Sequence, residues 1–482
     1  MAVRPRLSTM QQNTEGVLIS RTESVCPVCL KRISANRMSY GEDVYLEKTC
    51  EEHGPFRAVI WRGNDPAYAD WGGAPLSTSR TPVCGKTVGL GCPFDCGLCT
   101  DHRQQTCCVL LEVTGRCNLQ CPVCFAQAGG SGKTSEPSLP EIESWYKKLM
   151  SSGGPFNIQL SGGEPTLRDD LPEIIAMGRS MGFPFIQVNT NGLRLASDVE
   201  YARQLKEAGL SCVFLQFDGT SDEIYTTIRG KALFRIKNQA IEHCAELGLG
   251  VVLAVTVIPG VNDGAVGEII QFAVERMPTV RGVHFQPISY FGRYPKLPAN
   301  EDRITIPELI RAIGRQTGGR IPSSSLHPPR AENAYCSFQG NYVLMPDGEL
   351  KSWRQREPQG CCRQDPAAGA KKAREFVAQK WRMPAGTETL ESTTEEALSE
   401  TYDGCGVNTD SLDAFLDRVE RYSFCISGMA FQDAWTLDLE RLRECFIHVV
   451  AEDARIIPFC AYNLTDCDGH SMYRPLTAVG PK

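Results

Sequence analysis

Clustered cysteines constrain what this chain can fold into more than any other feature of its sequence. Of 22 cysteines among 482 residues, twelve lie between Cys26 and Cys124, many of them at C-x2-C and C-x3-C spacings. In a large chain that is not exported, cysteines at such spacings bind metals more often than they form disulfides. Cys212 and Cys244 lie alone in apolar stretches and are better explained as small buried side chains. The sequence therefore predicts a protein built around several metal centres.

Composition and charge describe an ordinary globular protein. Hydrophobic residues make up 42% of the chain and charged residues 22%, and the length predicts two to four domains. The net charge is −7, and no block of Lys and Arg offers a footprint for nucleic acid. No stretch approaches the roughly 20 apolar residues of a membrane span, and the first residues lack the apolar core of a secretory signal. We therefore expect a cytoplasmic protein that binds no nucleic acid.

Residues 1–82 predict a small metal ribbon. Cys26 and Cys29 form one C-x2-C turn, strand-like pieces such as DVYLEK follow, and Cys50 and His53 form a second turn. Two such turns bring four ligands to one tetrahedral ion, as in a zinc ribbon or a rubredoxin-like knuckle. Three thiolates and one imidazole suit Zn²⁺, although mononuclear iron fits the same ligands. In the alternative, His53 is a surface residue and another cysteine completes the site.

A cysteine-rich bridge over residues 83–108 predicts a second centre. Its loop is poor in apolar residues and needs a metal to become ordered. The C-x3-C-x2-C spacing of an iron–sulfur site is found at Cys92, Cys96 and Cys99. Cys84 is the natural fourth ligand, and Cys107 or Cys108 could take its place. With four protein ligands such a cluster would carry electrons rather than hold an open catalytic position.

The third segment, residues 109–320, alternates strand-like and helix-like patterns. Six apolar runs have the length and composition of buried strands: 109–113, 156–160, 184–189, 212–217, 251–257 and 282–287. Amphipathic helical patterns lie between them, for example at 139–152, 198–209 and 234–248. Six consecutive β/α units predict an α/β fold with a partial (β/α)6 TIM-like barrel and outer helices. Function in such folds gathers at the carboxyl ends of the strands.

The last segment, residues 321–482, is rich in loops and carries eight further cysteines. Its clearest helical pattern covers residues 433–453. We expect this segment to form a C-terminal cap domain.

A three-cysteine loop directly after the first predicted strand carries the chemistry. In TGRCNLQCPVCFAQAG the three cysteines are Cys117, Cys121 and Cys124. Three thiolates on a [4Fe-4S] cluster leave one iron without a protein ligand, and a catalytic metal needs such an open position. The loop resembles the signature of the radical S-adenosylmethionine (SAM) superfamily. That resemblance implies that SAM binds the open iron and is cleaved to a 5′-deoxyadenosyl radical, which abstracts hydrogen from a substrate.

Polar motifs follow the later strands, where members of this superfamily bind SAM. SGGEP follows the second strand and resembles the motif that meets the ammonium group; VNTNG, QFDG and VIPGVND follow the third, fourth and fifth strands. Val123 stands where the family commonly has an aromatic residue, and adenine contact at Phe125 would be made by the backbone. Each motif alone is a common turn, but four in strand order favour a cofactor site. The resemblance therefore assigns cofactor binding to Phe125, Gly162, Gly163, Glu164, Asn189, Asn191, Gln216, Asp218 and Pro259.

The resemblance extends beyond the barrel, except over residues 351–400. CPVC…KTCEEHG, GCPFDCGLC and ERLRECFIHV…IIPFCAYN together resemble the radical SAM subgroup that contains archaeal tetraether lipid synthase and a 7,8-dihydro-6-hydroxymethylpterin methyltransferase. Members of that subgroup carry auxiliary iron–sulfur clusters and a rubredoxin-like site. The resemblance implies a second auxiliary cluster bound by Cys445 and Cys460 and completed by Cys336 and Cys425, with Cys467 in reserve. Cys361 and Cys362 are better explained as ordinary loop thiols.

The leading hypothesis is a radical enzyme that functionalises an unactivated carbon of a lipid-like or pterin-like substrate, by C–C coupling or by methylation. A second hypothesis is a radical enzyme that matures a peptide or small molecule with the help of auxiliary clusters. A third, from another class, is a multi-cluster electron carrier without catalysis, which would leave SGGEP and VIPGVND without a role. An enzyme of either kind needs an electron donor such as ferredoxin or flavodoxin. A lipid substrate would also require an apolar tunnel or contact with a membrane surface.

Overall fold

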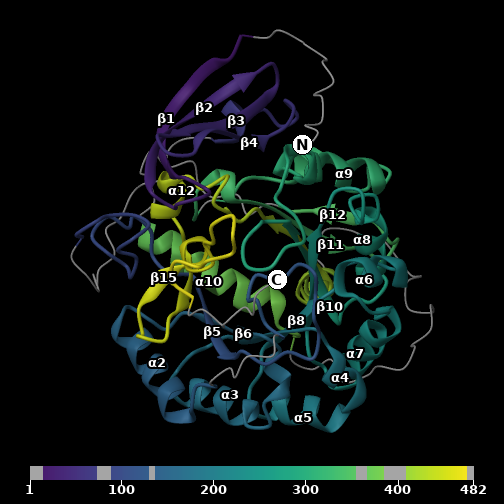
Figure 1. Cartoon of the computed structure of the whole chain (residues 1–482). Helices are drawn as coiled ribbons and strands as arrows, with labels where there is room; N and C mark the ends of the chain where they lie inside the picture. Colours follow the sequence, from purple (N-terminus) through teal and green to yellow (C-terminus); the bar gives the residue numbers. More distant parts are fainter. Residues whose placement is uncertain are drawn as a thin grey trace.

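Figure 1 shows the computed structural model, which describes residues 15–72, 88–129, 136–329, 331–353, 366–384 and 409–474. Cys84, Cys361 and Cys362 lie outside the described residues, so their roles stay predictions. Two sheets organise the described part of the chain, one of four strands near the N-terminus and one of eleven strands. No helix in that part is long and apolar enough to cross a membrane.

The N-terminal sheet is an antiparallel meander. Its strands pair in sequence order: β1 (Val17–Val25), β2 (Arg32–Tyr40), β3 (Asp43–Cys50) and β4 (Gly54–Trp61). The β1–β2 turn carries Cys26 and Cys29, and Cys50 and His53 flank the β3–β4 turn. Both turns lie at the same end of the sheet, so the four side chains gather there. A short helix, α1 (Tyr68–Trp71), follows the sheet.

The six predicted barrel strands are confirmed. They are β5 (Cys108–Thr114), β6 (Asn157–Gly162), β7 (Ile186–Thr190), β8 (Cys212–Gln216), β9 (Val251–Val257) and β10 (Val280–Pro287). Each pairs in parallel with the next, which makes an α/β core of the predicted kind. Both faces of a parallel sheet are covered, and this explains why continuous apolar runs rather than alternation marked these strands in the sequence.

Helices connect these strands around the outside of the sheet (Figure 1). They are α2 (Leu139–Ser151), α3 (Leu171–Ser180), α4 (Leu193–Ser197), α5 (Val199–Glu207), α6 (Asp222–Arg229), α7 (Phe234–Glu246), α8 (Val266–Val274) and α9 (Ile306–Gln316). α2 begins at a capping box in which Ser138 and Glu141 satisfy each other's backbone N–H groups. It buries Trp145 and Leu149 at helical spacing. The helices predicted within 139–152, 198–209 and 234–248 are confirmed.

The C-terminal segment extends this sheet at both edges. β13 (Ser423–Met429) pairs in parallel with β10, and β11 (Ser337–Leu344) and β12 (Leu350–Ser352) continue outward from it. At the other edge β14 (Ile447–Val450) pairs in parallel with β5, and β15 (Ile456–Pro458) pairs with β14. The full order is β12-β11-β13-β10-β9-β8-β7-β6-β5-β14-β15. Residue 320 therefore does not mark the edge of the core sheet, because strands from beyond it complete that sheet.

A helix from the segment that the resemblance does not cover lies across the amino ends of the barrel strands. This helix is α10 (Pro366–Trp381), and α11 (Thr409–Arg421) precedes β13. Asn157 of β6 and Arg281 of β10 both donate to carbonyl oxygens of α10, at 3.1 Å. Val377, Ala378 and Trp381 pack on the apolar side chains at this end of the barrel. α10 thus covers the end opposite to the carboxyl ends of the strands.

The helix predicted over residues 433–453 is wrong in extent. α12 covers only Leu439–Arg443, where Asp438 caps its first turn by accepting from the backbone N–H of Glu440, and β14 begins shortly after. Ile447 and Val449 of β14 are β-branched and pair with β5 at the edge of the sheet, and this pairing outweighs the helical periodicity. A last short helix, α13 (Phe459–Tyr462), follows β15.

Candidate active site and metal centres

The loop after β5 carries Cys117, Cys121 and Cys124, which line one end of a cavity of about 610 Å³. Arg293, from the segment after β10, holds this loop in place. Its Nε donates to the carbonyl oxygen of Cys121 at 2.9 Å, and it exchanges two backbone hydrogen bonds with Cys124, also at 2.9 Å. Phe125 lines the same cavity and packs on Phe459 at a ring separation of 5.7 Å. Segments following β5 and β10 therefore fix the three-cysteine loop together.

Burial governs the protonation of these thiols. It raises the pKa of Cys117 to about 12 and also raises the pKa of Cys121. A buried thiol stays protonated unless a cation takes the place of its proton. Three thiols gathered at the end of an open cavity fit a [4Fe-4S] cluster, which would supply that charge and would keep one iron without a protein ligand.

The turn after β6 approaches the three-cysteine loop so closely that only glycine fits. A Cβ on Gly163 would lie 2.1 Å from the carbonyl oxygen of Arg116, and one on Gly162 would lie 2.2 Å from that of Thr114. Gly162 also has φ of +115°, which side-chain-bearing residues rarely adopt. The backbone N–H groups of Gly163 and Glu164 donate to these two carbonyls at 2.7 and 2.8 Å. Both predicted glycines thus line the cavity next to Cys117.

Glu164 lines the cavity, but its carboxylate is already engaged. It accepts from Thr190 Oγ1 at 2.6 Å, from the backbone N–H of Asn191 at 2.7 Å and from that of Thr166 at 3.1 Å. Asn191 in turn donates to Asn118 Oδ1 of the three-cysteine loop at 2.7 Å. Glu164 therefore joins the carboxyl ends of β6 and β7 to that loop, and any direct contact with an ammonium group stays a prediction.

The sequence predicts Asp218 as a cofactor contact, but in the structure Asp218 does not line the cavity. Its fully buried carboxylate accepts from Arg229 at 2.7 and 2.8 Å and from the backbone N–H of Thr256 at 3.2 Å. Arg229 lines the cavity in its place. The amide oxygen of Gln216, turned toward this guanidinium, accepts from it at 3.0 Å. Asp218 therefore positions Arg229, and its contact with the cofactor stays a prediction.

Pro259 also lies outside the cavity lining. The turn that contains it is shaped by local hydrogen bonds, in which Asn262 Oδ1 accepts from the backbone N–H of Ile258 at 2.8 Å and Asp263 Oδ1 from that of Gly260 at 2.9 Å. These bonds close the turn on itself, away from the cavity. The remaining predicted contacts do line the cavity: Phe125, Gly162, Gly163, Glu164, Asn189, Asn191 and Gln216.

Two basic residues near the cavity were missed by sequence reasoning. Arg229 and Lys237 lie on helices α6 and α7 rather than in the motifs that follow the strands. Lys237 is fully buried, and its Nζ donates to the carbonyl oxygen of Asn191 at 2.6 Å. A lysine on the buried face of an amphipathic helix was the available signal, because charged residues are rarely buried without a partner.

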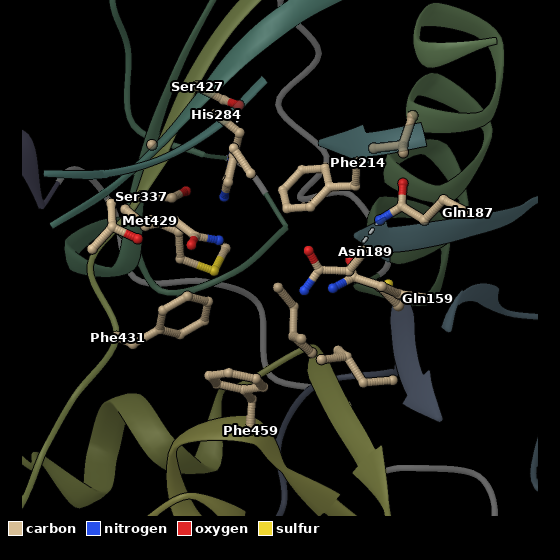
Figure 2. Close-up of a pocket in the computed structure, with 18 of the residues that line it drawn as sticks. Gln159, Gln187, Asn189, Phe214, His284, Ser337, Ser427, Met429, Phe431 and Phe459 are labelled. Atoms are coloured by element: carbon tan, nitrogen blue, oxygen red, sulfur yellow. Dashed lines mark hydrogen bonds between the residues drawn. The ribbon is translucent and has the colours of Figure 1, made fainter. Parts of the chain in front are cut away.

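The cavity continues from the three-cysteine loop into the interior of the barrel (Figure 2). TIM barrels normally fill their interior with branched apolar side chains. Here the inward positions carry amides, small residues and single rings: Asn157, Gln159, Gln187, Asn189, Phe214, Gln216, Ala254, Thr256, His284, Gln286 and Ser427. Phe431 and Phe459, with rings 4.4 Å apart, form an aromatic wall on the other side. The barrel therefore contains a hollow chamber in which amide side chains from several strands lie among apolar and aromatic ones.

The predicted ligands of the N-terminal ribbon come together. The ligand atoms of Cys26, Cys29, Cys50 and His53 all lie within 4.8 Å of one another. Cys50 Sγ is 3.5 Å from His53 Nδ1 and 3.9 Å from Cys29 Sγ. Hydrogen bonding to His53 lowers the pKa of Cys50 to about 6, which favours the thiolate that a metal needs. Four ligands at this spacing fit a single tetrahedral ion such as Zn²⁺.

The bridge cysteines described by the structure also lie together. Cys92, Cys96 and Cys99 are buried, and hydrogen bonding to Cys96 raises the pKa of Cys92 to about 11. Cys107 and Cys108, the alternatives to Cys84 as fourth ligand, line the barrel chamber instead. Cys84 itself lies outside the described residues.

Three of the four predicted C-terminal cysteines are neighbours. Burial raises the pKa of Cys445, and nearby Cys460 and Cys336 raise it further. Arg441 Nη2 donates to Cys336 Sγ at 3.5 Å, and the backbone N–H of Gln432 donates to Cys460 Sγ at 3.3 Å. Cationic and N–H donors directed at sulfur favour its thiolate form.

Cys425 and Cys467 do not join this group. Cys425 lies on β13, opposite Asn341 of β11, with its thiol next to Trp381 at the floor of the chamber. The register of β13 decides this position, and a sequence does not show register. Cys467 lies against the ribbon, where its backbone N–H donates to the carbonyl oxygen of Pro27 at 2.9 Å.

Sulfur spacing separates the ribbon from the other cysteine sets. In the described part of the chain, ligand atoms within 4.8 Å of one another occur in the ribbon and in an exposed group of Asp466, Asp468 and His470. The thiols of the three-cysteine loop, the bridge and the C-terminal set do not form such a group among the described residues.

Comparison with known proteins identifies the class. A Radical SAM superfamily model matches residues 111–273, and a model described as the HMPTM N-terminal zinc ribbon domain matches residues 18–62. The chain belongs to the radical SAM superfamily, as the three-cysteine loop predicted, and it is a radical SAM enzyme with a [4Fe-4S] cluster, SAM as cofactor and a zinc ribbon at its N-terminal end.

Within that class, one relative matches along nearly the whole chain. It is the 7,8-dihydro-6-hydroxymethylpterin dimethyltransferase of Methanocaldococcus jannaschii, 36% identical over 477 residues, which cover 92% of this chain and 93% of the relative. The Fe-coproporphyrin III synthase of Methanosarcina barkeri is 36% identical over 213 residues, which cover 42% and 49% of the two chains. The solved structure of methylornithine synthase has a TM-score of 0.35 at 15% identity and covers 45% of this chain and 63% of its own.

Proposed function

We propose that this radical SAM enzyme abstracts a hydrogen atom from a carbon of a dihydropterin and methylates that carbon. The abstraction gives 5′-deoxyadenosine, and the carbon radical, reduced by one further electron from the electron donor, takes a methyl group from a second molecule of SAM, which leaves as S-adenosylhomocysteine. The observation that carries the proposal is the 36% identity to a dihydropterin dimethyltransferase across ribbon, barrel and C-terminal segment together. The chamber supports it independently, because amides such as Gln159, Gln187 and Asn189 can pair the alternating hydrogen-bond donors and acceptors of a pterin ring, and aromatic side chains such as Phe214 can stack on it.

In this proposal, residues at the carboxyl ends of the strands bind and orient the cofactor. When bound, the cluster supplies the electron that cleaves the carbon–sulfur bond of SAM. Gly162 and Gly163 let the backbone after β6 approach the cofactor, and Asn189, Asn191 and Gln216 offer polar contacts beside it. Arg229 contributes a fixed positive charge, held by Asp218. These positions concentrate the polar contacts at the end of the cavity near Cys117, Cys121 and Cys124.

The other cysteine sets complete the proposal. We assign one auxiliary cluster to Cys92, Cys96 and Cys99, with Cys84 still predicted as the fourth ligand. A second is assigned to Cys336, Cys445 and Cys460. Such clusters would pass electrons from a donor such as ferredoxin or flavodoxin.

An alkyl-chain substrate is less well supported than a pterin. A lipid tail in the barrel would remove the amides of Gln159, Asn189 and Gln286 from water without replacing their hydrogen bonds. Each unpaired polar group of that kind costs about 1–3 kcal/mol. These inward amides therefore favour a heterocyclic substrate.

Anaerobic turnover tests the proposal. Reconstituted protein reduced with dithionite is expected to convert SAM and 7,8-dihydro-6-hydroxymethylpterin to 5′-deoxyadenosine and a pterin heavier by one or two methylene units. Cys117→Ala should abolish both products, whereas Cys244→Ala, which removes an isolated buried thiol of α7, should retain them. Formation of 5′-deoxyadenosine with no change in the pterin would overturn the substrate assignment. Failure of fully loaded protein to cleave SAM would overturn the enzymatic reading.

Iron counting tests the auxiliary clusters. Cys92→Ala and Cys460→Ala should each lower the iron content by the equivalent of one cluster. Cys425→Ala should leave the iron content unchanged, because Cys425 lies apart from the C-terminal set. An equal loss of iron in Cys425→Ala would contradict the assignment.

A further inference from the structure

Three side chains of the chamber face one another from strands β6, β8 and β10. Figure 2 shows Gln159, Phe214 and His284 around the same open space, on the side of the chamber opposite Phe431 and Phe459. None of the three belongs to the motifs expected to bind SAM. Each is held by a second residue behind it, so their orientations are set before any ligand arrives.

Gln159 presents a hydrogen-bond donor to the chamber. Its Oε1 accepts from Gln187 Nε2 at 2.5 Å, and Gln187 is 3% exposed. With its oxygen already accepting from Gln187, Gln159 offers a ligand the two N–H donors of its Nε2 group. Gln187 is thus a positioning residue for Gln159.

His284 presents one ring nitrogen to the same space. Its Nδ1 lies 2.9 Å from Ser427 Oγ, which leaves Nε2 directed into the chamber. Burial lowers the pKa of His284 to about 4, so the ring is neutral at pH 7. A neutral imidazole has one N–H group and one acceptor nitrogen, and the tautomer can adjust to the ligand.

Phe214 supplies a flat surface between these two polar groups. Its ring stacks on Trp381 of α10 with centroids 5.7 Å apart and planes 19° apart, and it is tilted against His284 at 5.6 Å. Trp381 covers one side of the ring, and the other side lines the chamber. Planar aromatic ligands stack on such a surface.

We propose that Gln159, His284 and Phe214 form the recognition site for the pyrimidinone ring of the pterin, with Phe214 under the ring and the two polar groups at its edges. The inference rests on the proposed function and adds the residues that select the substrate. This recognition site would also orient the substrate. On β7, Asn189 follows Gln187 toward the cofactor end, so a ring held at the level of Gln159 and Gln187 directs its outer substituents toward Cys117 and Cys121.

The sharpest test is Gln159→Glu, which keeps an oxygen for Gln187 to donate to but replaces the donor that faces the ligand. Phe214→Leu removes the flat surface and is the second variant. The control is Gln204→Leu, on the exposed face of α5. Anaerobic fluorescence titration with 7,8-dihydro-6-hydroxymethylpterin measures the Kd of each variant, and iron content with circular dichroism shows whether each has folded.

Both chamber variants should weaken pterin binding about 10-fold or more, with iron content equal to wild type, since one hydrogen bond or one stacking contact is lost. Gln204→Leu should bind as wild type does. Unchanged binding in folded Gln159→Glu and Phe214→Leu would overturn this inference while the proposed function stands. Absence of pterin binding by wild-type protein would overturn the proposed function and this inference together.

Discussion

Single residues at this site act through very short contacts and through charges buried in pairs. Gly162 and Gly163 lie directly against the carbonyl oxygens of Thr114 and Arg116, so the turn after β6 packs tightly on the segment that leads from β5 to Cys117. Asp218 and Arg229 form an ion pair in which the carboxylate is fully buried and the arginine side chain is 7% exposed. Neither feature tolerates a small change in shape or charge, which makes both suitable for substitution experiments.

Gly163→Ala should disable cofactor cleavage. The added Cβ would lie 2.1 Å from the carbonyl oxygen of Arg116, so the turn after β6 must move away from the loop that carries Cys117. A displacement of this kind can lower the rate about 100-fold. Formation of 5′-deoxyadenosine by reconstituted protein is the measurement. Gly264→Ala is the matched control, because nothing lies within 4 Å of its added Cβ. Equal activity of the two variants would contradict the prediction.

Asp218→Asn should destabilise the protein far more than Asp169→Asn. The first variant leaves the Arg229 guanidinium buried without its countercharge, a change that costs about 3–5 kcal/mol. The second removes a carboxylate that is 90% exposed from its pair with Arg194, which is worth about 0–1 kcal/mol. Thermal unfolding of both variants under identical conditions measures the difference. Similar Tm values would show that the buried pair is dispensable.

Glu332 should make stability fall as pH rises through the range between its unfolded and folded pKa values. Burial raises the pKa of this carboxyl to about 7, against about 4.3 for an unfolded glutamate. The folded chain therefore binds more protons than the unfolded chain between these pH values, and the slope of unfolding free energy against pH is negative. Over the whole window the loss is on the order of 3 kcal/mol.

The glutamine variant isolates that contribution. Glu332→Gln should lack this part of the pH dependence, so the difference in Tm between variant and wild type should grow from pH 4.5 to pH 7 and then level off. A constant difference across that range would show that Glu332 does not titrate there.

At the scale of elements, the sequence predicted the strands and helices that have a local periodic pattern. It missed the features that depend on pairing with a distant segment of the chain. The six barrel strands and the helices α2, α5 and α7 follow from apolar runs and helical periodicity, which are local properties. Residues 433–453 have helical periodicity too, yet Ile447 and Val449 pair with β5 from over 300 residues away. Cys425 lies apart from the other C-terminal cysteines with which it was grouped, because its neighbours depend on the register between β13 and β11.

The residues of the site likewise divide into those that the sequence predicted and those that it did not. Cysteine spacing revealed the ribbon ligands and the three-cysteine loop, since metal ligands must lie close in space and often lie close in sequence. Arg229 and Gln159 carry no such signal. One is a helix residue paired with a distant carboxylate, and the other is an inward position on a strand, which becomes visible only when the hollow barrel is seen.

The end of α10 is fixed by a buried guanidinium in addition to the contacts described above. Arg281 is 1% exposed and donates to the carbonyl oxygens of Lys380, at the end of α10, and of Glu420, at the end of α11, at 3.1 and 3.0 Å. A positive charge at the carboxyl ends of two helices is favourable, because carbonyl groups there lack partners.

Arg281→Met should therefore loosen α10. Its amide hydrogens should exchange about 10-fold faster or more with solvent, while those of β6 to β8 keep their protection. Hydrogen exchange followed by mass spectrometry measures this, with Arg203→Met on the exposed face of α5 as control. Unchanged exchange in α10 would mean that packing of Val377 and Trp381 is sufficient to hold the helix.

At the scale of the whole molecule, the ribbon is docked on the segment that carries the C-terminal cysteines. Arg37 of β2 pairs with Asp438 at 2.7 Å and with Glu440 at 2.5 Å. Lys48 of β3, 4% exposed, donates to the carbonyl oxygen of Ala434 at 2.7 Å. Figure 1 shows β1 beside α12, the helix that begins directly after Asp438. The metal of the ribbon thus supports a surface that borders the assigned auxiliary cluster.

Loss of the ribbon metal should also destabilise the C-terminal segment on which the ribbon is docked. Cys29→Ser removes one of the four ligands, and hydrogen exchange should rise in residues 17–61 and in residues 434–440, with β6 to β8 unaffected. Zinc content, measured with a colorimetric chelator, should fall by one ion per chain. Ser34→Ala in β2 is a control of similar size away from the ligands. A rise confined to the ribbon would show that the docking contacts survive without the metal.

The two edges of the core sheet are completed by strands that come late in the chain: β13 beside β10 and β14 beside β5. During synthesis the ribosome delivers all six inner strands long before either neighbour, so the growing chain displays two open edges until β13 and β14 have been made. Completion of the core sheet therefore has to wait for residues 423–450. A message truncated before residue 423 would yield a product prone to self-association rather than a smaller enzyme.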